Sequence, residues 1–206
     1  MATKPKTTKP KASKAKDPAR RILEAALRMA EEEGWQSLSL KAVAARLKMP
    51  LADLRRHYRD TDAVANAWFA LALDAMLAPP PRGFSRRPAA ARLEILMRRW
   101  FDALAPHRRV TAEMLSAKLW IFHPHHYVPM VFNLSRLIQW LRDLAGLDAG
   151  GLRKQIEETG LTALFLATLA VWCRDDTENQ ERTRAFLKRR LAQADGLMAR
   201  LFAGKQ

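Results

Sequence analysis

The chain has 206 residues, 49% hydrophobic and 28% charged, with a formal net charge of +15 and a pI near 10.7. This size allows one substantial core, and the low glycine and aromatic content favours helices over sheets. The single cysteine, Cys173, excludes an internal disulfide and a cysteine-based zinc site, and it fits a reducing bacterial cytoplasm.

Residues 1–16 combine lysine and proline with no acidic residue and no apolar cluster, which predicts a disordered basic tail. Two interpretations of this tail stay open: a solubilising segment, and an arm that binds DNA non-specifically. The rest of the chain is also basic, so nucleic acid is the expected partner, ahead of an anionic membrane surface.

The pattern after the tail is helical. Asp17 is a good N-cap, Pro18 suits the first helical position, and Gly34 can end the first helix. Ser39 can cap a second helix and Asp60 a fourth. The helices expected in this part are 18–33, about 40–47, about 51–58, and a long one from 61 past Met76.

A proline-rich stretch at 78–88 breaks the chain. Five more helices are expected beyond it, at about 89–104, 107–121, 126–145, 150–174 and 179–203. No run alternates like a strand, and no repeat is present. The predicted fold class is therefore all-α with about nine helices: an N-terminal helix-turn-helix unit at 17–62 and a larger body at 63–206.

The first fifty residues after the tail resemble the N-terminal domain of the TetR family of transcriptional regulators. The matching residues are Ile22-Leu23-Glu24-Ala25-Ala26, Gly34, Ser39, Val43-Ala44, Leu54-Arg55-Arg56-His57-Tyr58 and Asp60-Thr61-Asp62. This resemblance implies a homodimer that binds a palindromic operator in double-stranded DNA, with two helix-turn-helix units spaced by about one turn of the duplex, ~34–36 Å.

The expected DNA contacts lie on the second and third helices. Phosphate contacts are expected from Ser39, Lys41, Arg55, Arg56, His57 and Arg59, and base contacts from Leu51, Ala52 and Asp53. Lys48 stands where the family usually has glycine, which would cost on the order of 1 kcal/mol if the backbone there is left-handed. Operator binding is favoured over a solvated motif that has lost this role.

A second resemblance covers 165–198, which is similar to the end of the TetR-fold accessory proteins of ubiquinone biosynthesis. Those proteins bind lipid instead of DNA. The shared residues are Ala167-Thr168, Trp172, Asp175-Asp176-Thr177, Thr183 and Phe186-Leu187 with Arg189-Arg190. A non-enzymatic lipid-binding accessory protein is therefore the alternative to a regulator. A non-specific nucleoid binder that acts through the tail is a third, weaker hypothesis.

The helix expected at 150–174 is apolar on nearly all faces, so it must be covered on nearly all sides. A symmetric dimer would cover it. The interface residues expected there and on the last helix are Ala163, Ala167, Ala170, Phe186 and Leu187. The longest strongly apolar run, 161–173, is shorter than the ~20 residues that a transmembrane helix needs, so no transmembrane segment is predicted.

Large apolar side chains are dense in the body, and most are expected to form its core. The resemblance implies that some surround a cavity for an apolar ligand such as a lipid, an acyl chain or a quinone. The candidate lining residues are Met97, Trp100, Phe101, Met114, Trp120, Phe132, Trp140, Phe165 and Trp172.

No catalytic or cofactor motif is readable, so an enzyme is not expected. Asp175-Asp176-Thr177 is interpreted as a helix cap, with Thr177 or Asp176 as the capping residue. The histidines of HPHHY at 123–127 have irregular spacing and no acidic partner; a loop is favoured there over a metal or ligand sensor. We predict no metal site and no cofactor. The predicted function is a TetR-type regulator, most simply a repressor, controlled by an apolar ligand.

Overall fold

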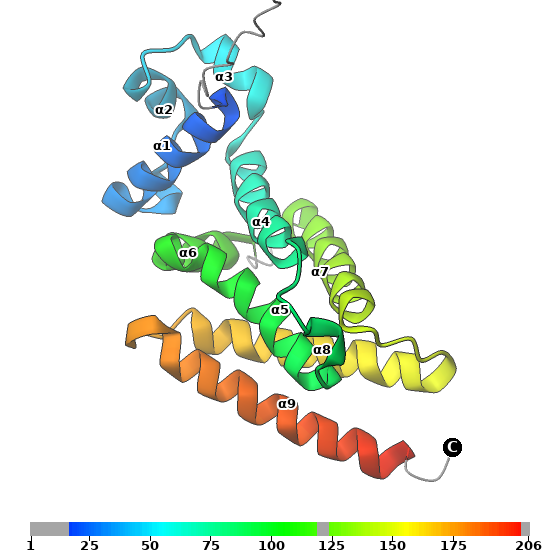
Figure 1. Ribbon diagram of the computed structural model, residues 1–206. Coiled ribbons are helices and arrows are strands. Elements are labelled where there is room, and N and C mark those ends of the chain that lie inside the picture. The colour runs from blue at the N-terminus through cyan, green and yellow to red at the C-terminus, as the bar shows by residue number, and fades with distance from the viewer. Residues whose placement is uncertain (1–16, 119–123, 203–206) are drawn as a thin grey trace, which may run out of the picture.

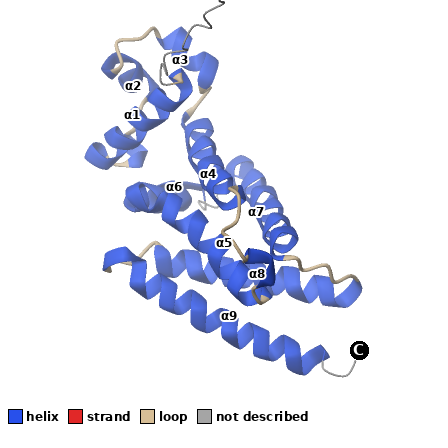
Figure 2. Cartoon of the chain, viewed as in Figure 1, coloured by secondary structure: helices blue, strands red, loops and turns tan. Residues whose placement is uncertain are grey.

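The structure is a computed structural model that describes residues 17–118 and 124–202, with side chains described outside 118–132 and 202. The described residues form helices and loops, without a strand among them (Figures 1 and 2). The α-helices are α1 (Pro18–Glu33), α2 (Leu40–Arg46), α3 (Leu51–His57), α4 (Thr61–Leu77), α5 (Ala89–Leu104), α6 (Arg108–Lys118), α7 (Pro124–Ala145), α8 (Gly151–Trp172) and α9 (Glu181–Phe202). The short 3₁₀ turns are η1 (Trp35–Ser37), η2 (Phe84–Arg86), η3 (Ala105–His107) and η4 (Glu178–Gln180). The predicted all-α fold class is confirmed.

Helices α1, α2 and α3 form a small unit around their own apolar side chains. The Asp17 carboxylate accepts a hydrogen bond from the Ala19 amide at 3.1 Å, and Gly34, with φ 88°, ends α1 as predicted. Residues from all three helices are fully buried in this unit: Ile22, Ala26, Val43, Ala44 and Leu54. Burial of this shared apolar surface holds the short α2 and α3, which would not be stable alone.

The turn between α2 and α3 contains Lys48 in the left-handed region, with φ 53°. The strain expected for a side chain at this position is therefore present. Ser39 occupies the N-cap position of α2, as predicted, but its side chain makes no capping hydrogen bond.

Helix α4 leads from this unit into the body and packs along α5 (Figure 1). Helix α5 is central, since it also packs against α7 and α9. Helices α8 and α9 run antiparallel at the end of the body farthest from α1–α3 (Figure 1). The body thus places a helix pair at one end of the molecule and the small unit at the other.

Thr177, one of the two predicted capping residues, is the N-cap of η4, and its hydroxyl accepts a hydrogen bond from the Arg182 amide at the start of α9 at 3.2 Å. The corner between α8 and α9 also depends on Asp175, which was not predicted. The Asp175 carboxylate is 1% exposed and accepts hydrogen bonds from the amide and hydroxyl groups of both Thr177 and Thr183. Burial by itself would raise the pKa of Asp175, but these hydrogen bonds outweigh it and lower the pKa to about 2. Asp176 is exposed and pairs with Arg182 at 3.2 Å.

Several helix boundaries differ from those predicted. Helix α8 ends at Trp172, where the indole Nε1 donates to Gln180 at 2.6 Å, and α9 starts only at Glu181, after η4. Helix α7 begins at Pro124, since proline suits a first helical position. The described part of α6 begins at Arg108, because the preceding residues form η3.

Candidate nucleic-acid interface

Helix α3 has an apolar inner face and a basic outer face. Leu54 is fully buried and Tyr58, directly after the helix, is 7% exposed. The Tyr58 hydroxyl donates to the Ala19 carbonyl at 3.2 Å, which ties the end of α3 to the start of α1. Burial, together with the charge of Asp17, raises the pKa of Tyr58. The exposed residues of α3 are Leu51, Ala52, Arg55, Arg56 and His57.

The cations of this surface differ in their partners. Arg56 pairs with Asp53 at 3.1 Å, Arg59 with Asp60 at 3.1 Å, and Arg46 with Glu32 at 2.6 Å. Within the described residues, Lys41 and Arg55 have no carboxylate at ion-pair distance. Pairs as exposed as these are worth little in water, so a phosphate can replace the carboxylate of Asp53 or Asp60.

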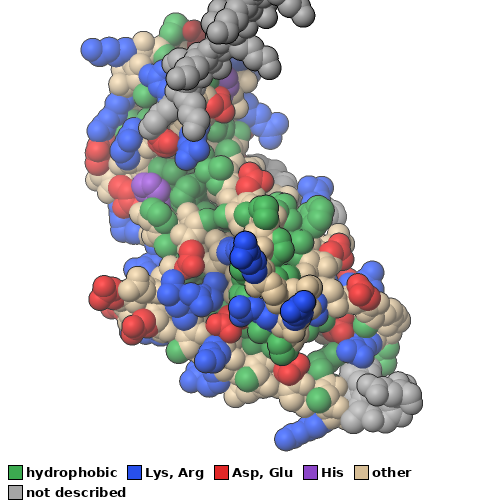
Figure 3. Space-filling model, viewed as in Figure 1, with side chains coloured by type: hydrophobic (Ala, Val, Ile, Leu, Met, Phe, Trp, Pro, Cys, Tyr) green, Lys and Arg blue, Asp and Glu red, His purple; other side chains and the backbone are tan. Residues whose placement is uncertain are grey.

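All nine predicted DNA-contact residues lie between Ser39 and Arg59, and all are exposed except Asp53, which is partly buried. Figure 3 shows Lys and Arg side chains around the outside of the N-terminal unit. Of the two arginines of α3, Arg56 forms an ion pair with Asp53, whereas Arg55 can bind a polyanion without breaking an ion pair.

A second feature, which sequence reasoning missed, joins this unit to the body. Glu113 on α6 accepts a hydrogen bond from the Trp35 amide at 2.6 Å and pairs with Arg109 at 2.6 Å. The Arg109 guanidinium also donates to the carbonyl of Glu31 at 2.5 Å, at the end of α1. The i,i+4 spacing of Arg109 and Glu113 is visible in the sequence, but nothing local indicates that α1 is their partner.

The candidate ligand-pocket residues are mostly in the core. Met97, Trp100, Phe101, Met114, Phe165 and Trp172 are buried, whereas Trp140 is 45% exposed. The ring centroids of Trp100 and Phe165 are 5.0 Å apart, and those of Phe101 and Trp172 are 5.7 Å apart. A ligand in this region would therefore have to displace a ring contact. Trp120 and the side chain of Phe132 lie outside the described residues, as do the tail 1–16 and the side chains of the HPHHY stretch.

The candidate dimer residues fall into two groups. Ala163, Ala167 and Ala170 lie on one exposed face of α8, which also carries Leu166, 46% exposed. Phe186 on α9 is partly exposed, but Leu187 is 1% exposed and belongs to the protomer's own core.

A three-helix unit that presents a basic third helix, joined by a long helix to an all-helical body, defines a helix-turn-helix regulator. The structure is similar to the crystal structure of a TetR transcriptional regulator from Nitrosomonas europaea, with a TM-score of 0.78 and 36% identity over 87% of this chain and 99% of that one. The chain belongs to the TetR family of transcriptional regulators.

Two more distant structures share the fold. A TetR-like regulator from Rhodococcus sp. RHA1 is 19% identical, with a TM-score of 0.57 over 86% of this chain and 94% of that one. AmtR from Mycobacterium smegmatis is 17% identical, with a TM-score of 0.52 over 93% of this chain and 97% of that one.

The COQ9 family matches a shorter part of the chain, residues 159–198, which covers much of α8 and α9. This match coincides with the resemblance to ubiquinone-biosynthesis proteins. A search of curated proteins finds no match. In the described part of the chain, no helix is both long and apolar enough to cross a membrane.

Proposed function

We propose that this chain is a homodimeric DNA-binding regulator that represses transcription and releases its operator when an apolar ligand binds. The observation that carries this proposal is the two-faced α3, in which Leu54 and Tyr58 anchor the helix while Arg55 and Arg56 face outward. Residues 17–62 would form the DNA-binding domain, and residues 63–206 the domain for ligand binding and dimerisation.

The exposed residues form two groups, according to the part of the DNA that each would contact. Ser39, Lys41, Arg55, Arg56, His57 and Arg59 hold phosphates, while Leu51, Ala52 and Asp53 at the start of α3 approach base edges. Asp53 suits a cytosine amino group, which donates a hydrogen bond in the major groove. Arg56 would leave Asp53 for a phosphate when the helix enters the groove.

Dimerisation through α8 and α9 places two such helices on one duplex. The exposed face of Ala163, Leu166, Ala167 and Ala170 is apolar and made mostly of small residues, so a second copy can approach it closely. Two antiparallel pairs would form a four-helix bundle, with the N-terminal units at the opposite end of each protomer.

An apolar ligand is supported by the concentration of aromatic and methionine side chains around α5 and α8, and by the partial match to COQ9. Its entry would separate rings such as those of Trp100 and Phe165 and shift the adjacent α4 through its packing on α5. Because α4 follows α3 directly, such a shift changes the spacing of the two recognition helices.

The decisive experiment is a competition gel shift with the DNA upstream of the chain's own reading frame against a random duplex at physiological salt. The proposal expects a strong preference for the upstream DNA, and loss of that preference in Arg55→Ala and Arg56→Ala. Equal binding to both duplexes would refute a specific operator, and loss of that binding on deletion of 1–16 would assign it to the tail.

The COQ9 match supports a second candidate: a non-enzymatic lipid-binding accessory protein of ubiquinone biosynthesis. Lipid extraction of the purified protein, followed by mass spectrometry, separates the two. Bound quinone or acyl lipid without any DNA preference would favour this candidate. If nothing is bound and neither quinones nor acyl chains shift the melting temperature, both this candidate and the apolar ligand fail.

A further inference from the structure

A pocket of about 230 Å³ lies between the start of α1 and the turn that joins α2 to α3. The described residues that line it are apolar or cationic: Pro18, Arg21, Ile22, Leu47, Lys48 and Met49. Arg21 and Lys48 are both exposed, and neither was among the expected DNA contacts. Among the described residues, the wall of this pocket thus contains two cations and no carboxylate.

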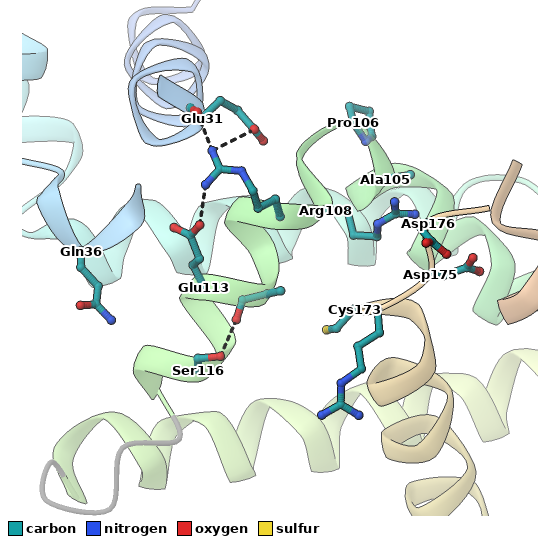
Figure 4. A pocket seen from close by; sticks show the side chains of 13 residues that line it. Glu31, Gln36, Ala105, Pro106, Arg108, Glu113, Ser116, Cys173, Asp175 and Asp176 are labelled. Carbon is teal, nitrogen blue, oxygen red and sulfur yellow. Dashed lines mark hydrogen bonds and ion pairs between the residues drawn. The ribbon is translucent and has the colours of Figure 1, made fainter. Parts of the chain in front are cut away.

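A larger pocket, of about 640 Å³, differs in charge. It lies where the end of α1, the start of α6 and the α8–α9 corner meet, and carboxylates line it (Figure 4). These carboxylates belong to Glu31, Glu113, Asp175 and Asp176. An anion would be repelled by them, so the smaller of the two pockets has the wall that suits an anion.

Arg21 and Lys48 have no carboxylate at ion-pair distance among the described residues. The acidic residues nearest to Arg21 in the chain have other partners. Glu24 binds Arg20 at 3.2 Å, and the Asp17 carboxylate caps the first turn of α1. A negative ligand can therefore bind these two cations without breaking an ion pair of the protein.

Lys48 also stands at a strained position of the backbone. Its φ of 53° lies in the left-handed region, which glycine adopts without this strain. Strain of this kind is concentrated at functional sites. Glycine would remove the strain, but it would also remove the ammonium group from the pocket wall. A lysine at this turn is therefore consistent with a use for its charge.

The pocket lies beside α3. The Tyr58 hydroxyl donates to the Ala19 carbonyl at 3.2 Å, which holds the end of α3 against the start of α1. At the other end of α3, Met49 of the pocket wall comes two residues before Leu51, the first residue of the helix. Figure 1 shows the start of α1 next to α3, at the end of the molecule away from α8 and α9. If α3 enters a DNA groove, the pocket lies close to the phosphates that border this groove.

We propose that this pocket binds one phosphate group of the DNA backbone, held between the guanidinium of Arg21 and the ammonium group of Lys48. The paired donors of a guanidinium and the compact charge of an ammonium group both suit phosphate oxygens. The proposal rests on the proposed function as a DNA-binding regulator and adds to it a contact from outside α2 and α3. Because phosphate contacts fix position and do not read sequence, this contact would set the register of α3 on the duplex through α1.

The salt dependence of DNA binding tests the two charges. Binding isotherms of the full-length protein are measured at several salt concentrations, with the upstream duplex and with a random duplex. Arg21→Ala combined with Lys48→Ala should reduce the slope of log affinity against log salt by about 1, because one phosphate contact is lost. No reduction, or a reduction of about 2 from two separate phosphate contacts, would overturn the shared site.

Two single variants serve as controls for this measurement. Arg21→Lys keeps the charge and should keep the slope of the parent chain. Arg28→Ala removes an exposed arginine of the same helix that lies outside the pocket, and it should leave the slope unchanged. A loss of slope in Arg28→Ala equal to that in the double variant would show a general effect of charge and would contradict the site.

Lys48→Gly separates the charge of this residue from its strain. This variant should bind DNA as weakly as Lys48→Ala, although its backbone is relieved of strain. Melting temperatures show that each variant is folded. If Lys48→Gly binds DNA as tightly as the parent chain, the ammonium group is not used and the proposal fails.

Chemically altered DNA locates the phosphate. Each phosphate of the upstream duplex is replaced in turn by a neutral methylphosphonate. We expect one position in each half-site at which this replacement weakens binding of the parent chain by about tenfold and leaves binding of the double variant unchanged. Equal effects on both proteins at every position would overturn the proposal.

The two duplexes separate failure of this site from failure of the proposed function. If the parent chain prefers the upstream duplex and the double variant keeps the full salt slope, the phosphate site is rejected and the regulator stands. If the parent chain has no preference but the double variant loses a slope of about 1 on the random duplex, the site stands and the specific operator is rejected. If the parent chain binds neither duplex, both fail.

Discussion

The carboxylate of Glu113 on α6 accepts a hydrogen bond of 2.6 Å from the backbone amide of Trp35, the first residue of η1. The two residues are 78 positions apart in the chain. Their hydrogen bond therefore joins the DNA-binding unit, α1–α3, to the body by a contact that does not involve α4. Arg109 reinforces it by binding both Glu113 and the carbonyl at the end of α1. The orientation of α1–α3 is thus fixed at two places, α4 and α6.

Loss of this link should loosen the DNA-binding unit selectively. We expect Glu113→Ala to lower the free energy of unfolding by about 1 kcal/mol, because it leaves a partly buried amide without its partner while the ion pair itself is half exposed. Hydrogen exchange should accelerate most at Trp35. Glu94→Ala is the matched control, since Glu94 and Arg98 are 3.9 Å apart on α5 alone. Equal exchange at Trp35 in both variants would contradict the link.

The two classes of arginine on the DNA-binding unit should respond differently to salt. Arg55→Ala should reduce the slope of log affinity against log salt by about 1, because an unpaired cation is lost from the phosphate contacts. Arg46→Ala should change this slope far less, because Arg46 is engaged by both oxygens of Glu32. Binding isotherms at several salt concentrations measure both slopes. Identical slopes for the two variants would contradict the assignment of Arg55, and not Arg46, to a phosphate contact.

Lys48 should be replaceable with a gain in stability. Its φ of 53° is strained for a residue with a side chain, so Lys48→Gly should raise the free energy of unfolding by up to about 1 kcal/mol. Part of this gain is offset because glycine loses more chain entropy on folding. Lys48→Ala, which removes the charge and keeps the strain, is the control. Urea denaturation compares the three proteins; a Gly variant no more stable than the Ala variant would argue against strain at this turn.

Asp175 should make stability depend on acid pH. Its pKa is about 2 in the folded protein and 3.8 for an ordinary aspartate, so it stabilises the fold fully above pH 3.8. That stabilisation, about 2 kcal/mol, is lost as the pH falls toward 2. Asp175→Asn should therefore be less stable than the parent chain at neutral pH, with a difference that narrows below pH 3.8. Urea unfolding at a series of pH values measures it, and a constant difference would be inconsistent with this role.

The exposed face of α8 should control assembly. Ala167→Glu would place two like charges in a symmetric interface and should raise the dimer dissociation constant by about a hundredfold. The control is Ala70→Glu on α4, which also introduces a charge at an exposed alanine but lies away from α8. It should leave the dimer dissociation constant unchanged. Sedimentation at several concentrations reports the result. A parent chain that is monomeric at micromolar concentration would refute the interface.

Local patterns in the sequence were sufficient for the helices and for the basic face of α3. The periodicity of Ile22, Ala26 and Met29, the caps Asp17 and Asp60, and the placement of Leu54 and Tyr58 each depend on neighbours within a few residues, so all were predictable. Strain at Lys48 followed in the same way from the family's usual glycine.

The contacts between distant segments were not predictable. The role of Asp175 depended on its burial against Thr183, and whether Leu187 faces the core or a partner depended on how α9 packs against the body. Likewise, the Trp35–Glu113 bond joins segments 78 residues apart. Helix formation is decided over one or two turns of chain, so the sequence itself determined the helices. Side-chain partners across the molecule depend on the packing of all the helices together, so only the tertiary structure decided the link between the DNA-binding unit and the body.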